Sequence, residues 1–158
     1  MDTSSAALKE IYNFHSLGKK LGTAGQPTEA QFRAIRDAGF EAVINLALPT
    51  SDNAIPNEGS VVTSLGMAYV HIPVNFKVPT TQDFQAFCKM MEAFHERPVF
   101  VHCAANMRVS AFVFLYRVLH QRVKIPEAQR DLHVIWEPDE VWSGFIQDQL
   151  KSGEKPVS

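Results

Sequence analysis

Cysteine is scarce in this chain: only Cys88 and Cys103 occur among 158 residues, too few for a disulfide framework. No apolar run approaches the roughly 18 residues that a membrane-spanning helix needs. The N-terminal residues lack the basic-then-apolar pattern of a secretion signal. We therefore expect a cytoplasmic protein that keeps its thiols free and does not bind membranes.

Neither sign of charge is in large excess, because the chain has 15 Lys and Arg and 17 Asp and Glu, which give a net charge of −2. Because the two signs are interspersed, the chain does not suit a protein that coats nucleic acid, although a small anion needs only a few charges. The six histidines show no metal-ligand spacing with cysteines or carboxylates. We expect no nucleic-acid partner and no metal site, and composition leaves the oligomeric state open.

Apolar residues make up 46% of the chain, which suits one globular domain with a sizeable core. Short apolar runs predict strands at 19–24, 42–47, 68–73 and 98–102. Helical spacing predicts helices at 6–14, 28–38, 61–65, 79–94, 109–121, 126–136 and 138–150, with a frayed tail from residue 151. Helices between strands imply parallel crossovers. We expect a single α/β domain over residues 1–158, with its core at about 18–150 and a short, mostly parallel sheet flanked by helices.

The residues with the clearest chemistry lie where the last predicted strand passes into a helix. The apolar run 99–101 leads into His102 and Cys103, and four small or neutral residues then precede Arg108. Backbone N–H groups and the positive end of a helix dipole would converge there and favour a thiolate. An arginine at the helix start can donate two N–H bonds to a tetrahedral oxyanion. The pattern predicts a nucleophile, an anion cradle and a charge clamp.

This cysteine-to-arginine segment resembles the cysteine-dependent protein tyrosine phosphatases, in particular the compact dual-specificity-like group of bacteria. Segments elsewhere are similar to the same family: Gly25-Gln26-Pro27-Thr28, Val43-Ile44-Asn45-Leu46, Tyr69-Val70-His71-Ile72-Pro73-Val74, and Trp136-Glu137-Pro138 with Trp142 and Phe145-Ile146. Together they cover most of residues 20–148. The resemblance implies a phosphatase-like fold.

In that family the cysteine attacks phosphorus, and water hydrolyses the resulting phosphocysteine. The resemblance implies that Cys103 is the nucleophile and Arg108 the clamp, with His102 holding the loop and favouring the thiolate, and Ser110 supporting it. The phosphate-binding loop would consist of Ala104, Ala105, Asn106, Met107, Arg108 and Val109. Substrates would be phosphate monoesters of the phosphotyrosine or aryl kind, free or on a phosphoprotein, and no cofactor would be needed.

The loop departs from the family pattern because four residues, not five, separate Cys103 from Arg108. Asn106 stands in for the usual loop glycine and tolerates a left-handed backbone better than most residues. In the register that we prefer, the loop is one residue shorter and Arg108 still opens the helix. In the other register, Ser110 keeps the hydroxyl position and Val109 falls at the arginine position.

The general acid is a second departure. Dual-specificity-like phosphatases carry an aspartate on a loop about thirty residues before the cysteine, and this chain has Asn75 there. Asp52 and Glu58, on the polar segment 49–59, are alternative acids because surface loops can move over a site. Without an acid, aryl phosphates should react faster than alkyl phosphates.

Two other functions fit the same residues. Rhodanese-type sulfurtransferases also have four residues between cysteine and arginine, and Cys103 would then carry a persulfide. Alternatively, the short loop and missing acid would belong to a non-catalytic module that binds phosphate or another anion.

Overall fold

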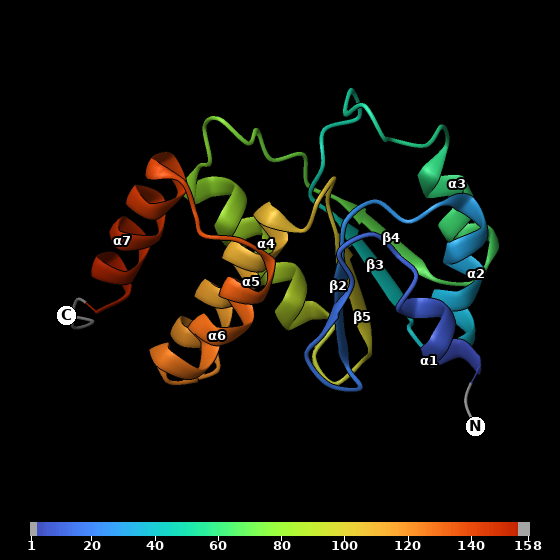
Figure 1. The fold of residues 1–158 in the computed structure, drawn as a ribbon, viewed down its shortest axis with the longest axis horizontal. Coiled ribbons are helices and arrows are strands. Elements are labelled where there is room, and N and C mark those ends of the chain that lie inside the picture. Colours follow the sequence, from blue (N-terminus) through green and yellow to red (C-terminus); the bar gives the residue numbers. More distant parts are fainter. Residues whose placement is uncertain (1–2, 155–158) are drawn as a thin grey trace.

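A five-stranded sheet lies at the centre of the computed structural model, which describes residues 3–154. The strand order is β1-β2-β5-β3-β4 (Figure 1). The strands are β1 (His15–Ser16), β2 (Leu21–Ala24), β3 (Ala42–Asn45), β4 (Ala68–His71) and β5 (Val99–His102). Only the β1–β2 pair is antiparallel, and the other pairs within the described residues are parallel. The predicted short, mostly parallel sheet is confirmed.

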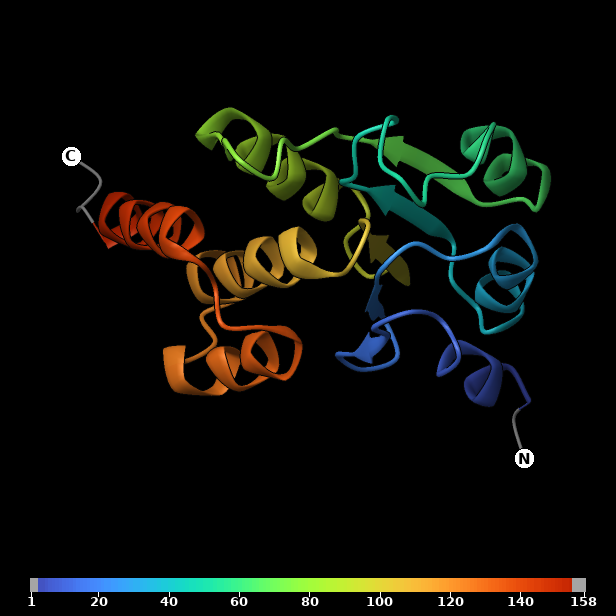
Figure 2. The ribbon, with the colours of Figure 1, turned by 45° about the horizontal axis from the view of Figure 1, so that its top comes forward.

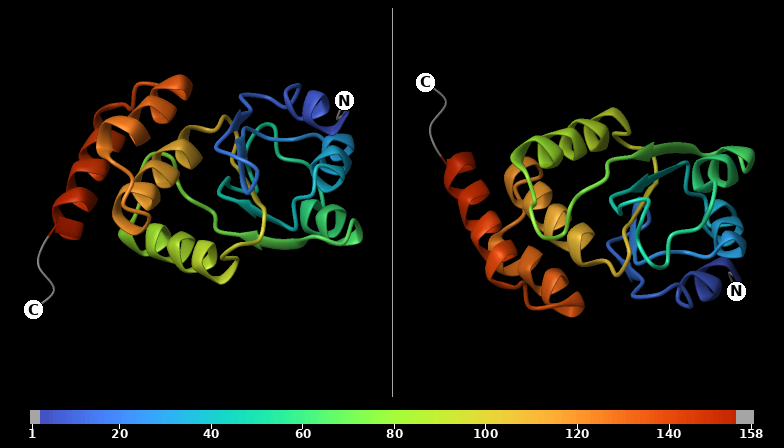
Figure 3. Two further views of the ribbon diagram at one scale, coloured as in Figure 1. Left: turned by 90° about the horizontal axis from the view of Figure 1, so that it is seen from below. Right: turned by 90° about the horizontal axis from the view of Figure 1, so that it is seen from above.

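Two groups of helices cover the two faces of this sheet (Figures 1 and 3). One side carries α1 (Thr3–Leu8), α2 (Glu29–Asp37) and α3 (Glu58–Ser64). The other carries α4 (Thr81–Ala93), α5 (Met107–His120), α6 (Ile125–Ile135) and α7 (Glu140–Glu154). The predicted α/β class is therefore confirmed. Among residues 3–154, no helix is long and apolar enough to cross a membrane.

Alternate side chains of the central strands enter two separate apolar clusters. Val43 and Phe100 are fully buried against Phe32 on the α1–α3 side. Their neighbours Ile44 and Val101 are equally buried in the cluster on the α4–α7 side, as the period of two along a strand requires. Burial on both faces explains why these strands are continuous apolar runs in the sequence.

Local signals set the ends of α2. The Thr28 side chain accepts the Gln31 N–H, while the Gln31 side chain accepts the Thr28 N–H, which is a capping box. Gly39 follows the helix with φ +100°, a conformation that glycine adopts without steric cost. Both ends lie where the sequence predicts them.

The terminal predictions are less accurate. The first helix ends at Leu8 instead of spanning 6–14, and β1 was not predicted because two residues show no periodicity. Helix α7 continues to Glu154, so the frayed tail predicted from residue 151 is wrong for 151–154. Residues 155–158 lie outside the described part of the chain.

The carboxyl ends of the four parallel strands meet at one edge of the sheet, at the top of Figure 1 and turned forward in Figure 2. Four connecting segments leave this edge: 25–28, 46–57, 72–80 and 103–106. Loops at the carboxyl ends of parallel strands carry the sites of open α/β sheets. The cysteine loop, the 49–59 segment and Asn75 therefore start from the same edge.

Candidate active site

Cys103 follows directly on β5. Its N–H donates to the Ala24 carbonyl of β2 (3.3 Å), and its side chain is fully buried in the apolar cluster of the α4–α7 side. The sequence predicts a thiol at the strand end that faces the field of the loop N–H groups, and burial alone leaves this a prediction.

The carbonyls of residues 103–106 all accept hydrogen bonds from the surrounding protein. The Cys103 carbonyl accepts from His102 Nδ1 (3.2 Å), and the Ala104 carbonyl accepts from the Gln26 N–H (3.1 Å) and from Asn53 Nδ2 (3.0 Å). The Ala105 carbonyl accepts from Asn13 Nδ2 (3.1 Å), and the Asn106 carbonyl accepts from the Ser110 N–H (2.9 Å). In a trans peptide the next N–H points opposite to the carbonyl, and none of the described peptides is cis. The N–H groups of residues 104, 105 and 107 therefore point away from these donors, toward the inside of the loop, as in a backbone nest that binds an anion.

Asn106 adopts the left-handed conformation (φ 67°) in the residue before α5. Its Nδ2 donates to the Asn13 carbonyl (2.9 Å) and to Thr23 Oγ1 (3.1 Å). Asn13, also left-handed at φ 50°, donates in return to the Ala105 carbonyl. This reciprocal pair holds the loop to the segment before β1. Asn13 and Thr23 were missed from sequence because each lies more than eighty residues from its partner.

Arg108 lies in the first turn of α5 and is 7% exposed. Its Nη1 donates to the Val74 carbonyl (2.8 Å), and its guanidinium carbon is 5.9 Å from the centre of the Phe76 ring. Its Nε has no hydrogen-bond partner, and it forms no ion pair with any carboxylate in residues 3–154. A buried cation without a counter-ion is costly. This position therefore favours a bound anion.

The residues after Arg108 belong to the helix. Val109 is fully buried in the apolar cluster, and Met107 is half-buried. Ser110 Oγ donates to the Met107 carbonyl (3.0 Å) and accepts from Trp136 Nε1 (3.1 Å). The Ser110 hydroxyl thus links the first turn of α5 to Trp136 at the end of α6.

The 72–80 segment carries no carboxylate. Asn75 is exposed, and its side chain accepts the Lys77 N–H (2.9 Å). Phe76 packs against the rings of Trp136 and Trp142, and its carbonyl accepts from Trp142 Nε1 (2.8 Å). The 72–80 segment is therefore held in place by the Phe76 contacts, and Asn75 provides a side-chain amide at the position where the sequence analogy predicts a general acid.

Glu58 does not act as a mobile loop acid, contrary to one sequence prediction. It is the first residue of α3, is 7% exposed, and places Oε2 2.6 Å from Nε2 of the fully buried His102. Gln26 Nε2 donates to its other oxygen (2.7 Å). Burial opposes ionisation, but hydrogen bonds and charge from His102, with a further bond from Gln26, hold the pKa of Glu58 below its ordinary value. A carboxylate held this way has no proton for a leaving group.

The other acid predicted on the 49–59 segment is Asp52. Asp52 is exposed, whereas its neighbour Asn53 contacts the loop through the Ala104 carbonyl. Nothing in the sequence singled out Asn53, although its segment follows a strand parallel to β5. Within the described residues, no group of three or more His, Cys, Asp or Glu side chains could hold a metal ion.

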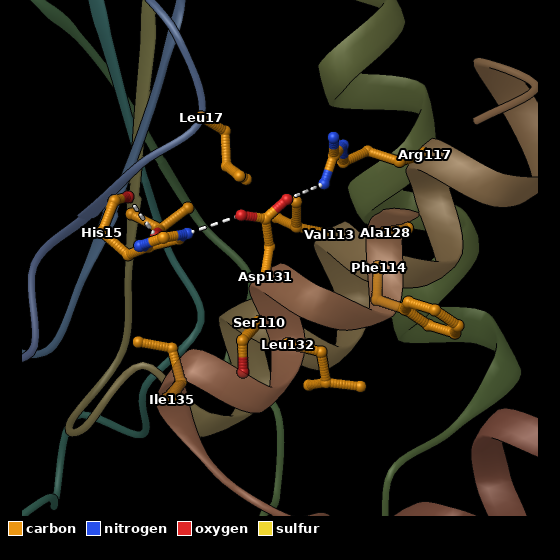
Figure 4. Close-up of a pocket in the computed structure, with 11 residues that line it drawn as sticks. His15, Leu17, Ser110, Val113, Phe114, Arg117, Ala128, Asp131, Leu132 and Ile135 are labelled. Atoms are coloured by element: carbon orange, nitrogen blue, oxygen red, sulfur yellow. Dashed lines mark hydrogen bonds and ion pairs between the residues drawn. The ribbon is translucent and has the colours of Figure 1, made fainter. Parts of the chain in front are cut away.

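A second histidine–carboxylate pair joins β1 to α6 (Figure 4). His15 Nε2 lies 2.8 Å from one oxygen of Asp131, and Arg117 Nη1 lies 2.7 Å from the other. Burial acts against ionisation, but these bonds from His15 and Arg117 hold the pKa of Asp131 below its ordinary value. The side chains of this trio make no hydrogen bond to residues 103–108, so the structure keeps them apart from the loop.

A family model described as "DSP-PTPase phosphatase fused to NAD+ Kinase" matches residues 12–142. The chain belongs to this family. The resemblance to dual-specificity-like phosphatases is thereby confirmed, and the chain has a phosphatase-like family and fold.

Relatives extend the likeness over most of the chain. A beta-lactamase hydrolase-like protein of Agrobacterium fabrum is 34% identical over 112 residues, which are 68% of this chain and 26% of that protein. The chain thus spans about a quarter of that relative's length. A DUF442 protein of Shewanella putrefaciens CN-32, provisionally assigned as a phosphatase, has a TM-score of 0.83 at 32% identity, covering 93% of this chain and 97% of its own. Tk-PTP in its active form has a TM-score of 0.71 over 92% of this chain and 98% of its own, and its 17% identity shows the fold alone.

Proposed function

We propose that this protein is a cysteine-dependent phosphatase that hydrolyses phosphate monoesters of the aryl or phosphotyrosine kind through a phosphocysteine. The observation that carries the proposal is the guanidinium of Arg108. It is buried without a carboxylate partner among the described residues, and it opens a helix beside a loop whose carbonyls bond outward. This arrangement supports the binding of a tetrahedral oxyanion.

The reaction then follows in two steps. The Cys103 thiolate attacks phosphorus, a sulfur–phosphorus bond forms, and the phosphorus–oxygen ester bond breaks to release a phenolate or alkoxide, which takes its proton from solvent water. A water oxygen next attacks phosphorus, and the sulfur–phosphorus bond breaks to give inorganic phosphate and the thiolate. The N–H groups of the loop and the Arg108 fork stabilise the equatorial oxygens in both transition states.

The leaving group determines the first testable outcome. Because Asn75 has no proton to give, we expect p-nitrophenyl phosphate to be hydrolysed and simple alkyl phosphates to react much more slowly. Asn75→Asp should raise alkyl phosphate turnover by about 10²-fold, the usual contribution of a general acid. The aspartate can accept the same Lys77 N–H, so the segment should keep its shape. Steady-state rates for the two substrate classes give the measurement.

Asp83→Asn is the matched control, since it changes a carboxylate of nearby α4 and should leave both rates as they are. If Asn75→Asp leaves alkyl turnover unchanged, the 72–80 segment is not the acid position.

Sulfur transfer is the second candidate, and the short gap of four residues between Cys103 and Arg108 favours it. In that reaction the thiolate takes the outer sulfur of thiosulfate and releases sulfite, and cyanide then removes the sulfur as thiocyanate. It predicts a stable protein species heavier by one sulfur atom after incubation with thiosulfate, measured by intact mass spectrometry. Thiocyanate formation without hydrolysis of aryl phosphates would select this function over the phosphatase.

A further inference from the structure

The His102–Glu58 pair lies directly behind the cysteine loop. His102 is fully buried at the end of β5, and Glu58 at the start of α3 is 7% exposed. The pair is also fastened to the loop by Gln26, whose N–H donates to the Ala104 carbonyl and whose Nε2 donates to Glu58. The His102–Glu58 pair is thus connected by hydrogen bonds to Cys103 and, through Gln26, to the rest of the loop.

The hydrogen bonds of His102 determine its protons. Nδ1 faces the Cys103 carbonyl (3.2 Å) and Nε2 faces a Glu58 oxygen (2.6 Å). A carbonyl can only accept, so Nδ1 donates to it, and an ionised Glu58 would accept from Nε2 in the same way. With Glu58 ionised, both bonds are those of an imidazolium whose charge Glu58 balances within the pair.

The pair can act on Cys103 in two ways. The bond to the Cys103 carbonyl turns that peptide outward, which points the Ala104 N–H into the loop. The imidazolium also places a positive charge on the residue next to the sulfur, and a nearby opposite charge favours the ionised form of an acid. Tyr69 of β4 also faces the pair, and the Phe32 ring meets His102 edge-on.

We propose that Glu58 is a positioning residue: through His102 it fixes a positive charge and an outward carbonyl at the base of the cysteine loop, and this favours the Cys103 thiolate. The inference rests on the proposed function, because it explains how the nucleophile of that reaction stays ionised. Glu58 touches neither substrate nor sulfur in this role.

The test is a pH titration of the ultraviolet absorbance of the thiolate. Glu58→Gln keeps the size of the side chain and removes its charge, so we expect the midpoint to move upward. A midpoint higher by one unit lowers the thiolate fraction about tenfold at pH values below both midpoints. Burial raises the pKa of the Cys88 thiol to about 12, and a Cys103→Ser spectrum subtracts any remaining background.

Asp131→Asn is the control, since it breaks a histidine–carboxylate pair of the same kind between β1 and α6. We expect its titration to match the wild type. A Glu58→Gln midpoint equal to the wild type, or an equal shift in both variants, would overturn the proposal. In an active enzyme, the acid limb of kcat/KM should move with the absorbance, which a purely structural loss would not produce.

Two further readouts keep the outcome decisive. If Glu58→Gln does not fold, the ¹⁵N spectra of histidine in the wild-type protein answer the question: both ring nitrogens of His102 protonated at neutral pH supports the proposal, and one protonated nitrogen overturns it. The absorbance needs no turnover. A wild type that lacks phosphatase activity therefore defeats the proposed function and leaves this test readable.

Discussion

Cys103→Ser is expected to abolish hydrolysis of p-nitrophenyl phosphate, with a loss of about 10⁴-fold or more. A serine hydroxyl fits the same space but does not ionise near neutral pH, so no nucleophile remains at the end of β5. Turnover of the aryl phosphate gives the measurement, and trapping of a phosphoenzyme with radiolabelled substrate should succeed only with the wild type.

Cys88→Ser is the matched control. Cys88 lies on α4, and burial raises the pKa of its thiol to about 12, so its loss should leave turnover intact. Activity that survives Cys103→Ser would remove the phosphocysteine mechanism. A wild type that binds phosphate without turning over any monoester would identify the chain as an anion-binding module.

Arg108→Met is expected to lower kcat/KM by about 10³-fold and, at the same time, to raise the temperature of unfolding. Methionine keeps an apolar stem of similar length but cannot donate to the equatorial oxygens, and each lost oxyanion donor is costly. The folded protein also no longer buries a guanidinium without a carboxylate partner in the described residues, which removes a destabilising term. Kinetics and thermal unfolding on the same samples give both quantities.

Arg117→Met separates this effect from arginine removal in general. Arg117 is paired with Asp131 at 2.7 Å, so its loss should lower stability and leave turnover near the wild-type value. If Arg108→Met both unfolds more easily and keeps its activity, then Arg108 is a structural residue and the anion site lies elsewhere.

The elements predicted correctly from the sequence are those with clear end signals or with an apolar pattern that matches their burial. The helix from Thr28 to Gly39 has a capping box at one end and a left-handed glycine at the other. The parallel strands are apolar because both of their faces are covered. From the parallel order alone, the loop after β5 and the segments after β3 and β4 could be expected at one edge.

The site itself was only partly predictable. Glu58 resembles any solvated loop carboxylate in the sequence, since its partner His102 is 44 residues away. The contacts of Asn13 and Asn53 with the loop carbonyls also arise from tertiary packing, not from any local pattern. The burial of Cys103 depends on how several elements pack, which no spacing rule encodes.

Full burial of the Cys103 side chain bears on how the protein withstands oxidation. Peroxide converts exposed thiolates to sulfenic acid, and further oxidation destroys a nucleophile irreversibly. Cys88 cannot readily rescue such a group, because a thiol with its pKa raised to about 12 is a poor attacking partner at neutral pH. Under the proposed function, any route by which a phosphate monoester reaches the sulfur is open to peroxide as well.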